Sequence, residues 1–138
     1  MLYHINLNVY LAYVPPHRNT VQRRLKRLQS DHKSLLIKQL SKVNSIAVTC
    51  DFWTGKRHYS YLCLTGYLIS SKSKFMSKIL SFSWFHERHT SANISMIIKK
   101  EMKELNIHEK TRSITTDGAA NMLNIDLSFC DGSKQIWC

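Results

Sequence analysis

Two aspartates each close a short run of β-branched residues. Asp51 ends the run 45–51, and Asp117 ends the run 113–117. Runs of this composition predict strands, and a side chain at the carboxyl end of a strand lies at the crevice where α/β folds bind ligands. Carboxylates suit hard cations such as Mg²⁺ and Mn²⁺. The pair therefore predicts a metal-binding nuclease site.

Each candidate residue also has a plain structural interpretation. Asp51 suits a turn after a strand, and Asp117 suits the N-cap of a helix that begins near Ala119. Trp53 is expected to fill the core, although its spacing from Asp51 places both on one side of a strand. Lys56 and Arg57, in the loop that follows, are candidates for contacts with DNA phosphates. A solvated turn explains these two bases equally well.

The charge of the chain is strongly positive and unevenly distributed. Twenty Lys and Arg residues against nine Asp and Glu residues give a net charge of +11. Residues 1–45 hold eight of the bases and one acid. Such an excess indicates either a solubilising surface or contact with an acidic polymer, and both interpretations stay open. The nucleic-acid-binding candidates in this segment are Arg23, Arg24, Lys26 and Arg27.

The hydrophobic pattern predicts an α/β fold with a mixed sheet. We expect extended structure over 1–12, then a helix from Thr20 to Lys42 with Asn19 or Thr20 as its N-cap and one apolar face. The predicted strands are 46–51, 59–70, 75–85 and 112–117. A helix is predicted over 92–105, before the last strand, with Thr90 or Ser91 as its N-cap. This β-β-β-α-β order lets the helix carry the fourth strand parallel to the first.

The predicted division is a basic lead-in over 1–45 and a partial catalytic core over 46–138. The segment 123–138 shows little periodicity, and the chain is expected to be cut short. The four cysteines form no C-x-x-C pair, so no zinc site is assigned. No apolar run approaches the roughly 18 residues of a membrane span. A reduced intracellular compartment is favoured over secretion.

Four motifs, in the same order along the chain, resemble those of the hAT superfamily of cut-and-paste DNA transposases and their BED-type zinc finger relatives. Residues 49–54 resemble the T-x-D-x-W-T-S strand, with Gly55 where Ser is usual. Residues 115–122 resemble the segment around T-D-x-A-x-N-M, and 89–94 are similar to H-T-G-E-N-I. Residues 13–21 are similar to the lead-in that precedes these motifs.

The resemblance implies an RNase H-like fold in which Asp51 and Asp117 are catalytic residues and the first two ligands of a Mg²⁺ or Mn²⁺ site. In this family the third ligand is a Glu far downstream, after a helical insertion. The partner implied is DNA, the compartment is the nucleus, and the full-length protein is a possible homo-oligomer.

We therefore expect a fragment of a hAT-like transposase whose ancestry is DNA cleavage and strand transfer, and which is inactive alone. The alternatives are a non-enzymatic, transposase-derived DNA-binding or regulatory protein, and a pseudogene product without function. An unrelated basic RNA-binding protein would explain the charge, but it leaves both aspartate motifs unexplained.

Overall fold

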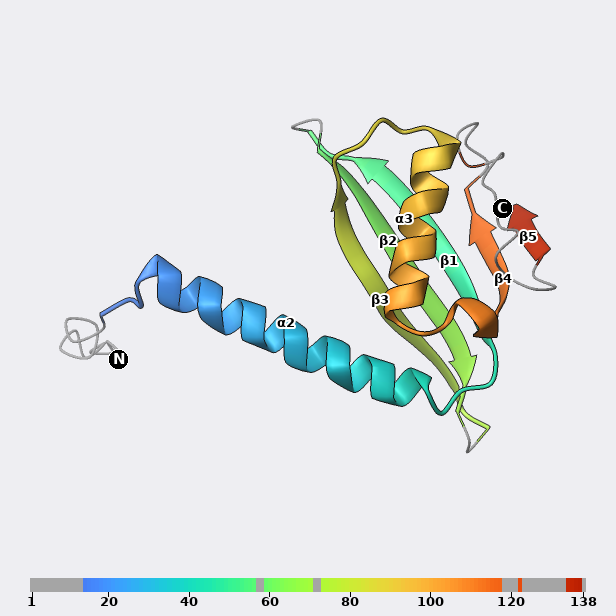
Figure 1. Ribbon diagram of the computed structural model, residues 1–138, viewed down its shortest axis with the longest axis horizontal. Helices are drawn as coiled ribbons and strands as arrows, with labels where there is room; N and C mark the ends of the chain where they lie inside the picture. Colours follow the sequence, from blue (N-terminus) through green and yellow to red (C-terminus); the bar gives the residue numbers. More distant parts are fainter. Residues whose placement is uncertain (1–13, 57–58, 71–72, 118–121, 123–133, 138) are drawn as a thin grey trace, which may run out of the picture. The chain divides into compact units, whose positions relative to one another are not determined.

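The computed structural model describes residues 14–56, 59–70, 73–117, 122 and 134–137 (Figure 1). The chain divides into two compact units, Met1–Ser34 and Leu35–Cys138, and each is described by itself. The predicted boundary at residue 45 stays a prediction. The predicted extended segment 1–12 and the predicted helix near Ala119 fall outside the described residues.

A five-stranded mixed sheet dominates the second unit. Its order is β3-β2-β1-β4-β5. Strands β1 to β3 form an antiparallel meander, whereas β4 pairs parallel with β1 and β5 pairs parallel with β4. The strands are β1 (Ile46–Thr54), β2 (Ser60–Ile69), β3 (Phe75–Phe85), β4 (Thr111–Thr116) and β5 (Lys134–Trp137). The mixed α/β sheet and the parallel fourth strand are confirmed, but β5 was not predicted, because four residues show too little periodicity.

Helix α3 (Ser91–Glu104) connects β3 to β4 and lies across one face of the sheet (Figure 1). Thr90 caps it, because its Oγ1 accepts a hydrogen bond of 3.3 Å from the backbone N–H of Asn93. Ile94, Ile98 and Met102 are fully buried at helical spacing. The short 3₁₀-helix η1 (His108–Lys110) then leads into β4. The predicted helix and its cap are therefore confirmed.

The residues of β1 alternate between the two faces of the sheet. Ile46, Val48 and Cys50 belong to the buried core, which includes the apolar side of α3. Because successive side chains point to opposite faces, Asp51 and Trp53 lie on the other face, and both are exposed. Among the described residues of this unit, no helix covers that second face.

Helix α2 (Arg18–Leu40) starts two residues earlier than predicted. The backbone N–H of Asn19 donates to Nδ1 of His17, and the carbonyl of His17 accepts from Val21. Asn19 and Thr20 therefore lie inside the first turn, and the predicted cap is wrong. At the C-terminal end of α2, Nζ of Lys110 donates 3.1 Å hydrogen bonds to the carbonyls of Leu40 and Ser41.

The apolar face predicted for α2 is exposed over most of its length. Leu36 and Leu40, in the last turns, belong to the core of the sheet unit. The remaining apolar residues are 40% to 64% exposed, namely Val21, Leu25, Leu28 and Leu35. Periodicity predicted the helix correctly, but periodicity cannot say whether a packing partner exists. None of the described helices is long and apolar enough to span a membrane.

Gly66 is predicted to be a position where even a methyl group destabilises the sheet. A Cβ built there lies 2.9 Å from Cδ1 and 3.0 Å from Cγ of Leu80, which is itself buried. Because overpacking a core costs about 1 to 3 kcal/mol, Gly66→Ala should lower the free energy of unfolding by that amount in urea denaturation.

Gly55→Ala is the matched control, since its Cβ would meet neighbours at ordinary distances of 3.6 Å. A second check is Gly66→Ala introduced into a Leu80→Ala background, where the added methyl should cost much less. Equal costs in both backgrounds would show that Leu80 is not the source of the penalty.

Candidate functional site

The parallel pairing of β1 with β4 places Asp51 and Asp117 at the same edge of the sheet. The register aligns Thr49 with Thr115 and Cys50 with Thr116. Each aspartate is the residue that follows this last pair, and both are exposed. Neighbouring strands lie about 4.8 Å apart. The structure therefore brings together two candidate residues that lie 66 positions apart in the sequence.

The thiol of Cys50 lies under this edge and responds to both carboxylates. Burial, and after it the negative charges of Asp51, Asp117 and Cys63, together raise the pKa of Cys50 to about 12. A thiol with such a pKa is protonated at neutral pH, whereas metal coordination needs the thiolate. Cys50 is therefore a small apolar core residue, and the oxygen atoms of the two aspartates are the donors at this edge.

The donor set suits a hard divalent cation. Two solvent-exposed carboxylates offer oxygen ligands, and water can complete the shell of Mg²⁺ or Mn²⁺. Among the described residues, no three His, Cys, Asp or Glu side chains are grouped closely enough to hold a metal ion. The residues therefore fit a cation that is held by two protein ligands with several waters.

Thr116 pairs with Cys50 across β1 and β4, on the buried face beneath the two carboxylates. Its Oγ1 is buried and has no hydrogen-bond partner among the residues that the structure describes. Thr111, at the start of the same strand, is also fully buried, but its Oγ1 donates a 3.0 Å hydrogen bond to the carbonyl of Ile107. The hydroxyls of Thr111 and Thr116 thus differ in whether they have a hydrogen-bond partner among the described residues.

Aromatic side chains continue the exposed face beside Asp51. Trp53 is 42% exposed, so the prediction that it fills the core is wrong. It pairs across strands with Tyr61, which pairs with Trp84, while Phe82 lies opposite Cys63. We call Trp53, Tyr61, Phe82 and Trp84 the aromatic face. The sequence pattern placed these residues in strands. It did not show that no described helix of this unit covers their side of the sheet, which is why they are accessible to solvent.

The predicted basic cluster of α2 is exposed to solvent. Its members are Arg23, Arg24, Lys26 and Arg27. Asp31 is the one acid near them, with its Oδ2 at 3.9 Å from Nε of Arg27. Exposed pairs of this kind contribute little, so most of the positive charge is available to a ligand. Lys56 is also exposed, in the turn after β1, whereas Arg57 falls outside the described residues.

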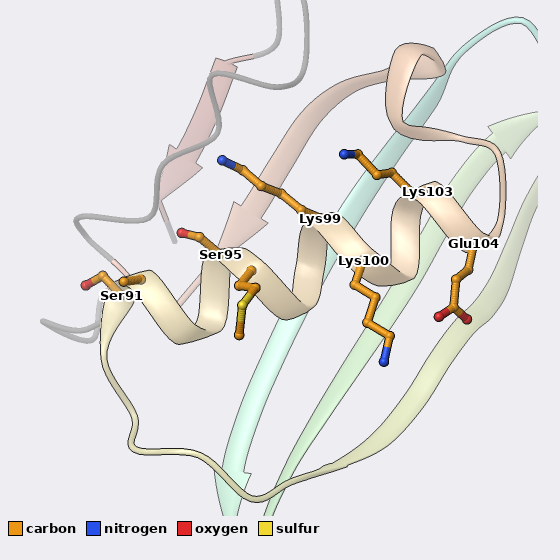
Figure 2. Close-up of a pocket in the computed structure, with 8 residues that line it drawn as sticks. Ser91, Ser95, Lys99, Lys100, Lys103 and Glu104 are labelled. Atoms are coloured by element: carbon orange, nitrogen blue, oxygen red, sulfur yellow. The ribbon is translucent and has the colours of Figure 1, made fainter.

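A second group of lysines lines a groove along α3, and sequence analysis did not single it out. The groove has a volume of about 840 Å³. Lys99 and Lys103 extend from one side of the helix, and Lys100 extends from another (Figure 2). Because α3 covers the sheet face opposite Asp51, this groove is separated from the two carboxylates by the sheet. The helical spacing of these lysines is visible in the sequence, but the same spacing is found on any solvent-exposed helix face.

The model of the ZBED1 RNase-like domain matches residues 49–130, which is more than half of the chain. The chain belongs to this family. The match begins within β1, before Asp51, and extends past Asp117, so it covers the edge that holds both aspartates. The RNase-like assignment agrees with the mixed sheet and the parallel β1 and β4.

Curated relatives extend the assignment. The protein "Putative transcriptional regulator tpeD" from Talaromyces stipitatus is 26% identical over 91% of this chain and 15% of its own length. The proteins "Putative AC transposase" and "Putative AC9 transposase" from Zea mays are each 28% identical over 75% of this chain. Together these matches identify a transposase-derived domain of the hAT family. The chain spans 12% to 15% of the length of these relatives.

Thr111 and Thr116, the two buried threonines of β4, should respond differently to replacement by valine. Thr116→Val removes a buried hydroxyl that has no partner, so stability should stay unchanged or rise slightly. Thr111→Val removes a buried hydrogen bond and should cost about 1 kcal/mol. Chemical denaturation of the two variants measures the difference. A larger loss in Thr116→Val would show that its hydroxyl has a partner in solution.

Proposed function

We propose that this chain is a transposase-derived DNA-binding domain in which Asp51 and Asp117 hold a divalent cation, Mg²⁺ or Mn²⁺, against a DNA phosphate. The observation that carries the proposal is the register of β1 and β4, which ends on both aspartates at one edge. Two carboxylates this close repel each other, and a cation relieves that repulsion. The match to the ZBED1 RNase-like domain model spans both aspartates.

A bound divalent cation supplies Lewis-acid chemistry that activates an attacking water or hydroxyl and stabilises the leaving oxygen in phosphodiester cleavage. Asp51 and Asp117 would hold it and orient the phosphate beside it. Two carboxylates with flexible water ligands do not fix the geometry that efficient chemistry needs. The proposal therefore assigns this chain an ancestry of cleavage and strand transfer, with no cleavage by itself. Plasmid nicking in Mn²⁺ that disappears in Asp51→Asn would contradict this assignment.

The proposed contact with the DNA backbone is the basic cluster of α2. Its four side chains are exposed and carry one neighbouring acid. Binding through phosphates is independent of sequence and weakens with salt. Nuclear localisation follows from a DNA partner, and a homo-oligomer is proposed for the full-length protein.

The second candidate function is a regulatory protein that binds DNA without any metal chemistry. The tpeD relative supports it, because the name of that protein describes a transcriptional regulator and the match covers 91% of this chain. The two candidates differ in the role of the carboxylates. In the regulatory protein, Asp51 and Asp117 are strand-end residues, and replacing them leaves cation binding and DNA binding unchanged.

Mn²⁺ should stabilise the folded protein through the two aspartates. At ten times its Kd, a ligand of the native state adds about 1.4 kcal/mol, which corresponds to a Tm rise of about 4 to 6 °C. The shift should disappear in the variant Asp51→Asn with Asp117→Asn. Asp31→Asn, an exposed acid on α2, is the matched control and should keep it. An equal shift in all three proteins would place the cation elsewhere.

The basic cluster of α2 should dominate binding to duplex DNA. If it neutralises about four phosphates, the slope of log affinity against log salt concentration is about −3.6. Replacing all four bases of the cluster with Gln should flatten this slope and weaken binding equally on unrelated sequences. Fluorescence anisotropy across a salt series measures both.

The control replaces Lys99, Lys100 and Lys103 in the groove of α3 with Gln. This variant removes almost as much charge while leaving α2 intact. Unchanged affinity in the α2 variant, together with a loss in the α3 variant, would move the DNA contact from α2 to the groove.

A further inference from the structure

The aromatic face is a feature of the sheet unit that the proposed function does not use. Phe82 is 59% exposed and Trp84 is 50% exposed, although both are side chains that usually bury. They lie beside Trp53 and Tyr61 on the sheet face that no described helix of this unit covers. Contiguous exposed apolar surface of this kind marks an interaction site.

The strand register orders these side chains in two rows that run across the sheet. One row is Asp51, Cys63 and Phe82, and the next row is Trp53, Tyr61 and Trp84. The rings lie close together, because the centroids of Trp53 and Tyr61 are 5.9 Å apart and those of Tyr61 and Phe82 are 5.7 Å apart. A candidate metal ligand and an aromatic platform therefore share one face.

We propose that the aromatic face binds unpaired nucleotides of single-stranded DNA, whose bases stack on Tyr61, Phe82 and the neighbouring indoles. This inference rests on the proposed function, because it places those nucleotides next to the phosphate held at Asp51 and Asp117. Every base has a flat π surface, so stacking on aromatic side chains tolerates any sequence. The ligand class is thus single-stranded DNA without sequence preference.

The position of Asp51 argues against an apolar protein segment as the ligand of the aromatic face. A protein segment packed across both rows would cover Asp51 and remove its carboxylate from water, which is costly without a partner. A nucleotide places its base on the rings and its phosphate at the edge. Because β1 and β3 run in the same direction, Lys56 after β1 and both Glu87 and Arg88 after β3 lie at the edge that holds the aspartates, and all three are exposed. The two bases, together with a cation at the aspartates, are the groups there that can contact the phosphate.

The test compares a fluorescein-labelled oligothymidylate with a duplex of equal length, in EDTA so that no cation contributes. The variant Tyr61→Leu with Phe82→Leu keeps apolar bulk and removes two rings. We expect its affinity for the single strand to fall about tenfold, which is the loss of roughly one stacked base. Its affinity for the duplex should change less than about twofold.

Phe75→Leu is the matched control, because Phe75 is a 68% exposed aromatic residue at the opposite end of β3. It should bind both ligands as the wild type does, and thermal melting confirms that each variant is folded. Unchanged single-strand affinity in the double variant overturns the proposal. A wild-type dimer that dissociates in this variant, with single-strand affinity unchanged, also overturns it and assigns the aromatic face to a second copy.

These titrations, together with the melting shift in Mn²⁺, separate this inference from the proposed function. If the α2 variant loses duplex affinity but the double Leu variant keeps its single-strand affinity, the aromatic inference fails and the DNA-binding proposal stands. If the double Leu variant loses single-strand affinity, but Asp51→Asn with Asp117→Asn leaves the melting shift in Mn²⁺ unchanged, the stacking site stands and the cation proposal fails.

Discussion

The parallel pairing of β1 with β4 is the constraint on which the site depends. Parallel neighbours cannot be joined by a tight turn, so the chain must cross from β3 to β4 over the sheet. Helix α3 makes that crossing, and its buried Ile94, Ile98 and Met102 secure it against the core. The register that results ends with Cys50 opposite Thr116. A shift of one residue would move one aspartate to the buried face, where an unpaired carboxylate is costly.

The two faces of the sheet have different chemistry because, in the described part of this unit, helix α3 covers one face and no helix covers the other. The covered face holds the apolar core, including Cys50, whose thiol stays protonated there. The uncovered face holds the carboxylates at one edge and the aromatic face beside them. The lysines of the α3 groove lie beyond the covered face, so the sheet separates them from the aspartates. Binding of DNA at the carboxylate edge therefore calls on other bases of the sheet unit, such as the exposed Lys56.

Sequence reasoning predicted what depends on local pattern. The strand Phe75–Phe85, the cap at Thr90 and the parallel β4 followed from β-branched runs, a capping residue and connection rules. Burial was predicted less well, because it depends on partners that a single sequence does not name. Leu25 and Leu28 match the helical period yet are exposed. Trp53 lies in strand β1 and is exposed as well. The aspartate pair was predicted from its motifs, while the aromatic face needed the cross-strand register of β1, β2 and β3.

The central claim is that Asp51 and Asp117 share one cation. Paramagnetic Mn²⁺ broadens NMR signals of nearby nuclei, so titrating it into ¹⁵N-labelled protein locates the bound ion directly. The account predicts early, selective broadening of the amides of residues 50–52 and 116–117, which Asp51→Asn abolishes at both strand ends together. Broadening centred on the helix α3, or broadening at one strand end that survives replacement of the other aspartate, would contradict a shared site.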